Sequence, residues 1–506
     1  MKNLFFKILA VFLLQTIFFQ NIYAERHKEF ITTKELRGRV DFWIDIFAKY
    51  GKYQAVFHHR EYPQATFDVM DFSHLANKLN SVQLDKHIQK AKKDKISEIN
   101  KIIKDLQNGR NPSSALARKI KDAFLLVPGN EKSQYERAVK EDLVRSQTGI
   151  KERYEEAIIR SGRYMPIIEN IFVNEFHLPI ELTRLPFVES SFDYKAYSSV
   201  GAAGIWQFMP STARSYMKVN NLIDERRDVI TATRSAAKYL KSAYQTLGHW
   251  PLAVTSYNHG VAGVNRKVKK IGITDISKIV EHPTERIFGF ASNNFFPELL
   301  AAIEIYDKKY KYFPNVKIEQ PHNVVEYKLS YATSVRHIQS RLNISQEDLR
   351  SYNYAIAERV WNGSYRIPAG YVLKVPYTYK QQLVHLKSPE PTTASSSVIY
   401  GVGTYKVRKG DNLISISKKY GLSVKELKEL NQLKSNNIYI GQTLIVNDEQ
   451  KSNSETTSKG SKYHTIRKGE NLAIIAKKYN TSISNIQKLN GLKSTKIIAG
   501  KKLRVG

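Results

Sequence analysis

The chain of 506 residues contains no cysteine. Its absence excludes disulfide bonds, a thiol nucleophile, thiolate metal sites and a lipid-bearing cysteine behind an export signal. Acidic residues are also scarce, with 47 Asp and Glu against 79 Lys and Arg and a formal net charge of +32. We therefore expect an anionic partner, and nucleic acid, anionic lipid and bacterial wall polymer all fit this charge. The length itself predicts several domains.

Long apolar runs are missing except at the start of the chain. Lys2 precedes the run FFKILAVFLLQTIFF, Lys7 lies near its start, and a small residue, Ala24, follows. This arrangement is typical of a secretory signal, so residues 1–24 are predicted to be cleaved and the rest exported to the periplasm or cell envelope. An exported chain is not expected to bind nucleic acid. The run is short for a bilayer span, and membrane association through an uncleaved segment is the alternative.

The last third contains an internal repeat, with copies at residues 404–447 and 462–506. The first reads YKVRKGDNLISISKKYGLSVKELKELNQLKSNNIYIGQTLIV, and the second reads YHTIRKGENLAIIAKKYNTSISNIQKLNGLKSTKIIAGKKLRV. Each predicts a strand, an R-K-G-[DE]-N-L turn, two helices and a closing strand. The acidic residue of the turn lies near a helix N-terminus, where negative charge is favoured.

These copies resemble LysM modules, small βααβ domains that bind N-acetylglucosamine-containing glycans. The resemblance implies a shallow sugar groove between the turn after the first strand and the loop before the last. The implied residues are Gly410, Asp411, Asn412, Leu413 and Ile438 in the first copy, and Gly469, Glu470, Asn471, Leu472 and Ile497 in the second. Residues 325–378 are more weakly similar to the two copies and lack the G-[DE]-N-L turn. We interpret this segment as a degenerate LysM-like module.

The rest of the tail consists of linkers, and the region before the central segment has no assigned role. Residues 387–403 and 448–461 are too polar, or too rich in Ser, Thr and Pro, to form a core. Residues 25–150 are Lys-rich and predicted to be mainly helical. His58 and His59 are adjacent there, but no third metal ligand is usefully spaced, so we expect a surface or packing role.

One acidic residue lies at an unusual place in LPFVESSFDYKAYSSVGAAGIWQFMP, which starts at Leu185. Leu182, Leu185 and Glu189 are three and four residues apart, so on a helix Glu189 would continue an apolar stripe. Apolar surroundings raise the pKa of a carboxyl group, which can then hold a proton near neutral pH. Glu189 is therefore a candidate general acid. A helix that starts or kinks at Pro186 fits the same pattern.

The same segment resembles the catalytic domain of soluble lytic transglycosylases, and its motif order is closest to the membrane-bound lytic murein transglycosylase D group. Four ordered motifs carry the resemblance: E-S-S-F from Glu189, S-S-V-G-A-A-G-I-W-Q-F-M-P from Ser198, DERRDVITATRSAAKYL from Asp224 and AVTSYNHG up to Gly260. The resemblance implies a goose-type lysozyme-like α-helical fold, which we assign to residues 151–315. The expected fold class is thus multidomain, an all-α catalytic domain with small βααβ modules.

This resemblance also implies the chemistry. Such enzymes cleave between N-acetylmuramic acid and N-acetylglucosamine with one carboxyl group as acid and base, forming a 1,6-anhydro product without water. Carried over, Glu189 is catalytic, and the residues implied to bind substrate are Ser198, Trp206, Gln207, Tyr257 and Asn258. Phe295 in NNFFPELLAA stands where relatives usually carry Tyr, so another residue replaces the hydroxyl or the rate changes.

Two alternatives remain. A second carboxylate across the sugar would allow water to attack, making the chain a hydrolytic muramidase. Asp193, Asp224 and Glu225 are the candidates, although we expect Asp193 to cap the loop that follows the helix. The other alternative is a wall-binding scaffold with weak activity, which the Phe295 departure keeps open. The expected partner is the peptidoglycan glycan strand, and neither a metal nor another cofactor is implied.

Overall fold

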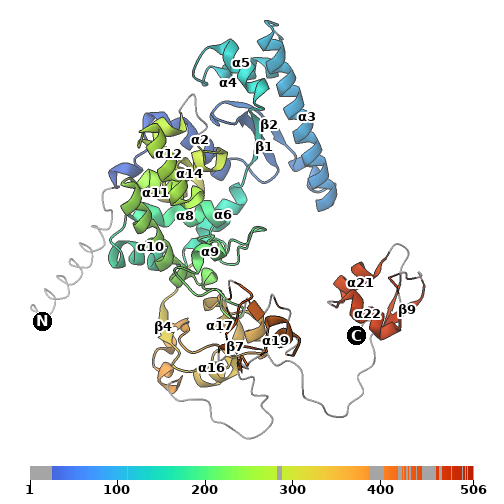
Figure 1. Cartoon of the computed structure of the whole chain (residues 1–506). Helices are drawn as coiled ribbons and strands as arrows, with labels where there is room; N and C mark the ends of the chain where they lie inside the picture. The colour runs from blue at the N-terminus through green and yellow to red at the C-terminus, as the bar shows by residue number, and fades with distance from the viewer. Residues whose placement is uncertain are drawn as a thin grey trace, which may run out of the picture. The chain divides into compact units, whose positions relative to one another are not determined.

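The computed structural model describes residues 26–110, 112–281 and 288–386, and, with short gaps, residues 404–446 and 463–504. The described chain divides into two compact units, residues 1–400 and 401–506. Residues 1–24 and both linkers lie outside the described residues. Figure 1 shows the helices and strands along the chain.

The first part of the chain builds a small three-stranded antiparallel sheet of order β2-β1-β3. In the register of the central strand, Val56 lies opposite both Val69 and Gln147. The long helix α3 packs against β3 and α5, and α4 packs against β2 (Figure 1). The strands are β1 (Gln54–His59), β2 (Thr66–Asp71) and β3 (Val144–Thr148), and the helices are η1 (Lys28–Phe30), α2 (Lys34–Ala48), η2 (Ser73–Leu75), α3 (Ser81–Gln107), α4 (Ala115–Phe124) and α5 (Glu131–Lys140).

In residues 25–150 one feature was not expected from the sequence, and one predicted boundary needs correction. The region contains this sheet, which helical periodicity did not indicate. Its first helix, α2, also shares a hydrophobic core with the helices beyond residue 151 and packs against α14 (Phe290–Asp307). The boundary at 150/151 therefore cuts through one core. His58 and His59 are fully buried within this part of the chain, and the His58 ring lies 4.6 Å from that of Phe42, so the packing role is the one observed.

The central segment is helical and forms one core around α10, α11 and α14. Trp250 stacks on Tyr244 between the first two of these helices. The elements are α6 (Lys151–Ser161), α7 (Met165–Asn170), the π-helical turn η3 (Ile171–Glu175), η4 (Ile180–Arg184), α8 (Leu185–Ser190), α9 (Pro210–Ala213), η5 (Glu225–Arg227), α10 (Val229–Leu247), α11 (Trp250–His259), α12 (Val261–Ile271), α13 (Ile276–Val280), α14 and α15 (Lys309–Tyr312).

The next segment pairs β4 with β5 in an antiparallel sheet and has helices between the two strands. It is joined to the central helical segment by backbone hydrogen bonds from Asp224 to Ala355 and from Ala357 to Leu222. A buried ion pair between Lys374 and Asp228 reinforces this contact. The elements are β4 (Val324–Lys328), α16 (Val335–Leu342), α17 (Gln346–Tyr352), α18 (Glu358–Trp361), β5 (Val372–Pro376), η6 (Tyr377–Tyr379) and η7 (Gln382–Leu386).

The second unit contains two small modules, each with its own core. In each, a first strand pairs with the last in an antiparallel ladder. The described elements are β6 (Thr404–Lys406), α19 (Leu413–Lys419) and β7 (Thr443–Ile445) in the first module, and β8 (Tyr463–Thr465), α21 (Leu472–Lys478), α22 (Ile483–Asn490) and β9 (Lys502–Arg504) in the second. Among the described residues, no helix is both long and apolar enough to cross a membrane.

Candidate active site

Glu189 lies near the end of the short helix α8. Pro186 occupies the first turn of this helix, where its missing N–H leaves no hydrogen bond unmade. The helix ends at Ser190, and its C-cap residue Ser191 and the next residue Phe192 both have left-handed backbone angles (φ 51° and 57°). This turn reverses the chain directly after Glu189.

The Glu189 side chain is half-buried, and its helix neighbours Leu185 and Phe187 are fully buried. Burial raises the pKa of Glu189 to about 8, and the nearby carboxylate of Glu298 adds to the rise. A carboxyl group with this pKa is protonated at neutral pH. The group can therefore donate a proton, as a general acid must.

The glycine-rich loop after α8 is a rigid, hydrogen-bonded turn. The Ser198 N–H donates to the Ala202 carbonyl at 2.8 Å, and the Ser198 Oγ accepts a bond from the Ala202 N–H at 2.9 Å. Gln207 has a left-handed backbone (φ 46°), and its Nε2 donates to the Gly204 carbonyl at 2.7 Å. Ser190 donates to the Ile205 carbonyl at 3.0 Å, which ties this loop to the helix that carries Glu189.

Arg226 holds the glycine-rich loop through hydrogen bonds to its backbone, a role that the sequence pattern did not reveal. Its buried guanidinium donates to the carbonyls of Gly201 (2.6 Å) and Phe208 (3.1 Å) and pairs with Asp224. Gly204 lies directly over the same residue, because a Cβ there would be 1.8 Å from the Arg226 carbonyl oxygen. The available signal was the position of this Arg within DERRD, one of the four ordered motifs.

Tyr257 and Asn258 lie together near the end of α11. The Tyr257 hydroxyl donates to the Trp206 carbonyl at 2.9 Å, and the ring is half-buried. Burial, together with the nearby charge of Glu189, raises the pKa of Tyr257 well above its ordinary value. Asn258 is exposed, and its Oδ1 accepts a hydrogen bond from Ser292 at 2.7 Å. The structure thus brings Glu189 and Tyr257 together from helices far apart in the sequence.

The expectation that Trp206 binds substrate is wrong for the structure described. Its side chain is fully buried, stacks on Phe172 at 5.4 Å and donates from Nε1 to the Thr233 hydroxyl at 2.9 Å. An indole with no exposed face cannot form a platform for a sugar ring, so Trp206 supports the loop from within the core. Phe295 is also almost fully buried, with its ring parallel to that of Tyr257 at 6.5 Å.

The carboxylates considered as hydrolytic partners are engaged in local structure. Asp193 accepts a hydrogen bond from the Lys195 N–H at 2.9 Å, which is the loop-capping role expected for it. Asp224 pairs with Arg226, and Glu225 accepts from the Lys218 N–H at 2.6 Å. The carboxylate that does influence Glu189 is Glu298 on α14, which no sequence motif indicated.

In the repeat modules, the implied glycan-binding residues fall into two groups. Gly410, Asn412 and Asn471 are exposed at the turn before the first helix, and Ile438 and Ile497 are half-buried in the closing loops. The side chains of Asn412 and Asn471 accept hydrogen bonds from the backbone of Ser415 and Ile474 and so cap the first helix. Gly469 lies outside the described residues.

The other implied residues of the modules pack in the module cores or form hydrogen bonds and ion pairs within the modules. Leu413 and Leu472 are buried in the two module cores, so their side chains do not face a glycan and pack within the modules instead. Asp411 accepts hydrogen bonds from the Tyr405 hydroxyl (2.8 Å) and the Arg408 N–H (2.7 Å). Glu470 lies 2.7 Å from Nε2 of buried His464.

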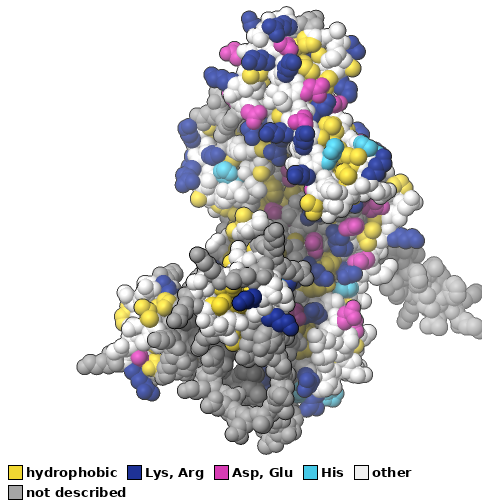
Figure 2. All heavy atoms as spheres, turned by 90° about the vertical axis from the view of Figure 1, so that its right-hand side faces the viewer, with side chains coloured by type: hydrophobic (Ala, Val, Ile, Leu, Met, Phe, Trp, Pro, Cys, Tyr) yellow, Lys and Arg dark blue, Asp and Glu magenta, His cyan; other side chains and the backbone are white. Residues whose placement is uncertain are grey.

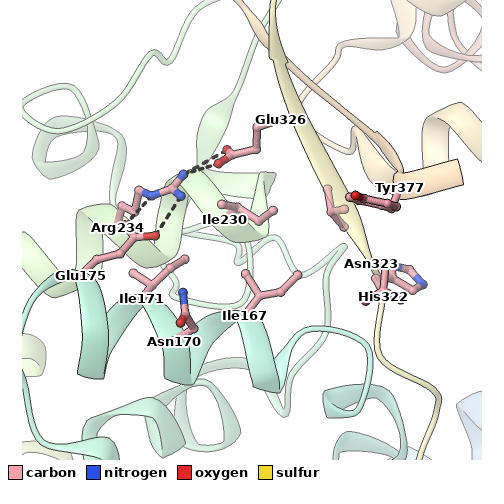
Figure 3. A pocket seen from close by; sticks show the side chains of 11 residues that line it. Ile167, Asn170, Ile171, Glu175, Ile230, Arg234, His322, Asn323, Glu326 and Tyr377 are labelled. Carbon is pink, nitrogen blue, oxygen red and sulfur yellow. Dashed lines mark hydrogen bonds and ion pairs between the residues drawn. The ribbon is translucent and has the colours of Figure 1, made fainter. Parts of the chain in front are cut away.

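The structure also contains an open cavity of about 520 Å³ away from these residues, between α7, η3, α10 and the β4 strand (Figure 3). Arg234 lies at one end, where it bridges Glu175 and Glu326. None of the predicted site residues lines this cavity. Because its charged groups already pair with one another, we do not assign the reaction to it.

Comparison with family models finds two kinds of domain in the chain. Residues 173–280 match the transglycosylase SLT domain, and residues 405–447 and 464–506 match the LysM domain. The fold class expected from the sequence is thereby confirmed.

Individual relatives are similar to parts of the chain. The membrane-bound lytic murein transglycosylase D of Escherichia coli (strain K12) is 28% identical over 331 residues, which is 63% of this chain and 71% of the relative. An N-acetylmuramoyl-L-alanine amidase of Staphylococcus aureus (strain USA300) is 42% identical over 107 residues, 20% of this chain and 32% of the relative.

Among solved structures, the 70 kDa soluble lytic transglycosylase of Escherichia coli aligns with a TM-score of 0.25 and 14% identity, covering 45% of this chain and 44% of that one. The domain matches show a transglycosylase SLT domain followed by two LysM domains, and over 63% of its length the chain is similar to a lytic murein transglycosylase.

Proposed function

We propose that the chain cleaves the β-1,4 bond between N-acetylmuramic acid and N-acetylglucosamine in peptidoglycan, with Glu189 as the single acid and base. The observation that carries the proposal is the half-buried carboxyl group of Glu189, whose pKa is raised to about 8. At neutral pH this group is protonated and can act first as an acid. The similarity to a murein transglycosylase supports the choice of substrate.

The reaction needs no second protein carboxylate. The Glu189 carboxyl group donates its proton to the bridging oxygen while the bond from that oxygen to C1 of the muramic residue breaks. The resulting carboxylate then takes the proton from the C6 hydroxyl of the same residue, and O6 bonds to C1. The product is a 1,6-anhydro end, and no water is consumed. The raised pKa supports both steps, because a more basic carboxylate is also the better proton acceptor.

The LysM modules are proposed to hold the enzyme on the glycan. Tyr439, in the closing loop of the first module, is 72% exposed and offers an aromatic face of the kind that sugars stack on. The exposed Gly410 and Asn412 lie at the turn of the same module. Lys and Arg side chains are scattered over the described surface (Figure 2), and the net charge of +32 favours binding to an acidic wall.

Residues 325–378 are proposed to be a degenerate LysM-like module that has become part of the catalytic unit. The order β4, α16, α17, β5 supports this interpretation, with the extra turn α18 before the last strand. The buried Lys374–Asp228 pair holds it against α10. We also propose that residues 1–24 direct export to the periplasm or envelope, with cleavage after Ala24, which N-terminal sequencing of the mature protein tests.

The test of the catalytic proposal uses Glu189→Gln, which keeps the shape of the side chain but cannot transfer a proton. Glycan cleavage should fall by at least about 10²–10⁴-fold, the usual contribution of general acid–base catalysis, while wall binding persists. Glu347→Gln, on an exposed residue of α17, is the matched control and should leave the rate unchanged. Activity of E189Q within a few-fold of the parent would remove Glu189 from the mechanism.

Product analysis separates the remaining alternatives. Mass spectrometry of muropeptides released from purified wall should find 1,6-anhydro ends and no new reducing ends. Predominantly reducing ends would mean a hydrolytic muramidase. Wall binding without released muropeptides would mean a scaffold.

The proposed role of the tail is tested by deleting residues 447–506. Two modules tethered to one enzyme raise avidity by roughly 10²–10⁴ when both reach the polymer, so the deletion should weaken wall pull-down. It should also reduce the dependence of pull-down on salt, because basic residues are lost with the module. Unchanged pull-down would exclude the second module as an anchor.

A further inference from the structure

A short chain of hydrogen bonds holds the exposed side chain of Asn258 at the end of α11. Its Oδ1 accepts a bond from the Ser292 hydroxyl at 2.7 Å, and the Ser292 Oγ lies 3.2 Å from Nδ1 of His259. Ser292 is buried in the first turn of α14, which packs against α11. Two helices that meet in the core therefore supply the three groups.

The number of protons available fixes the direction of these bonds. A serine hydroxyl has one hydrogen to donate, and Ser292 donates it to Asn258. The Ser292 oxygen can then only accept from His259, so Nδ1 of His259 carries the proton. In the reversed chain, the Asn258 NH2 would donate to Ser292, and Ser292 would donate to an unprotonated Nδ1. The histidine tautomer thus decides which end of the Asn258 amide is turned toward Ser292.

Packing fixes the orientation of the His259 ring. The ring lies edge-on to buried Phe288, with the ring centres 4.8 Å apart. Its opposite edge lies against Gly263 of α12, where an added Cβ would be 2.8 Å from Cδ2 and 3.2 Å from Nε2 of His259. Because Cδ2 and Nε2 face this glycine, Nδ1 faces Ser292. Among the described residues, Ser292 is the hydrogen-bond partner of the ring.

The other end of the Asn258 amide is left for a partner outside the chain. Its side chain is exposed, and no hydrogen bond from Nδ2 to another described residue is found. Asn258 directly follows Tyr257, whose hydroxyl holds the glycine-rich loop through the Trp206 carbonyl at 2.9 Å. The unused NH2 therefore belongs to a residue at the junction between α11 and that loop.

We propose that Ser292 and His259 are positioning residues that orient the Asn258 amide, so that its NH2 donates to an acceptor oxygen of the glycan strand. This inference rests on the proposed function. An acetamido carbonyl can only accept a hydrogen bond, and a sugar hydroxyl can accept one through its oxygen. An NH2 held toward the ligand therefore matches either oxygen. Neither Ser292 nor His259 needs to touch the glycan, because both act through Asn258.

Orienting the amide in advance lowers the cost of binding. An unrestrained asparagine side chain would present Oδ1 or Nδ2 and would have to be ordered when the glycan arrives. Ser292 is buried and the His259 ring is packed on both edges, so the amide is already oriented before a ligand is bound.

The experiment measures kcat/KM of the full chain on a soluble glycan strand. Asn258→Ala should lower it by about 5- to 10-fold, the usual effect of one lost hydrogen bond. Ser292→Ala should lower it by about 3- to 5-fold, because the amide is no longer fixed. The double variant should be no less active than N258A, since Ser292 acts through Asn258. Ser292→Thr keeps the hydroxyl and should retain most of the parent rate.

Two further variants test the direction of the bonds. Asn258→Asp still accepts from Ser292 but replaces the NH2 by a second acceptor, so it should lose at least as much activity as N258A. His259→Phe keeps the edge-on contact with Phe288 but removes the donor Nδ1, so its loss should match that of S292A. This variant also tests the inference if S292A folds poorly.

Ser235→Ala is the matched control. Ser235 is a buried serine of α10 whose hydroxyl donates to the Thr231 carbonyl at 2.8 Å, so its loss should lower the melting temperature and leave kcat/KM unchanged. Losses that multiply in the double variant would overturn the inference, as would parent activity in N258A or N258D. An active E189Q variant would instead overturn the proposed function, so the two failures are distinguishable.

Discussion

The hydroxyl of Tyr257 donates a 2.9 Å hydrogen bond to the backbone carbonyl of Trp206. This bond joins α11 to the glycine-rich loop at the point where the buried Trp206 side chain holds that loop to the core. Because the donor proton of Tyr257 is already used, the residue acts on the site chiefly through the position of the loop. Gln207, the next residue, depends on the same support.

Replacing Tyr257 by Phe should therefore affect stability and loop position together. The lost bond leaves the Trp206 carbonyl without its partner, which should lower the free energy of unfolding by about 1 kcal/mol. The rate of glycan cleavage should also fall, because the loop that carries Gln207 shifts from its position when the hydrogen bond is lost. Urea denaturation and steady-state kinetics measure the two effects. Unchanged stability together with a complete loss of turnover would contradict this, because it would require the hydroxyl to act on the substrate itself.

Gly204 should be very sensitive to substitution. Its backbone is left-handed (φ 74°), and an added Cβ would lie 1.8 Å from the Arg226 carbonyl oxygen. Gly204→Ala should therefore lower the free energy of unfolding by more than about 3 kcal/mol, since backbone strain and overlap add. Gly248→Ala is the matched control: its φ is 75° but nothing lies within 4 Å, so only the strain of about 1–2 kcal/mol should appear. Equal losses at both positions would show that the contact with Arg226 relaxes.

The ion pair between Lys374 and Asp228 should be important for the attachment of the β4–β5 segment to the catalytic helices. Both side chains are buried, and Asp228 also caps α10. Lys374→Met should lower the free energy of unfolding by about 3–5 kcal/mol, because it leaves the charge of Asp228 buried without a partner. Adding Asp228→Asn should recover part of the loss. A double variant no more stable than the single one would argue against this explanation.

The raised pKa of Glu189 makes a signed prediction about stability. The folded chain holds this proton up to about pH 8, whereas an ordinary Glu loses it near 4.5. Between these values the folded state binds more protons, so this group's contribution is fully present below about pH 4.5 and is lost as pH rises through about 8. E189Q has no titrating carboxyl group at this position and does not lose this stability. The difference in melting temperature, E189Q minus parent, should therefore increase from pH 5 to pH 8. A constant difference across that range would refute the raised pKa.

Local pattern was sufficient for the parts of the chain that local physics controls. The repeat, its turns and its strands are visible in the sequence because every copy must bury the same small core. A helix that starts or kinks at Pro186 was expected, and α8 starts one residue before it, while the apolar residues before Glu189 indicated a carboxyl group that resists ionisation. The loop-capping role of Asp193 also followed from its position at a helix end.

Tertiary structure decided which side chains face the site and which face the core. Trp206 and Leu413 lie within motifs that suggest sugar contact, yet both are buried, because burial depends on what packs above them rather than on their own neighbours in the chain. Glu298 influences the pKa of Glu189 only because α14 packs on α8, and Arg145 reaches Phe290 of α14 from strand β3. The sequence by itself thus determined the modules and the candidate acid. Long-range packing decided the electrostatic surroundings of that acid, since charges act through space and not along the chain.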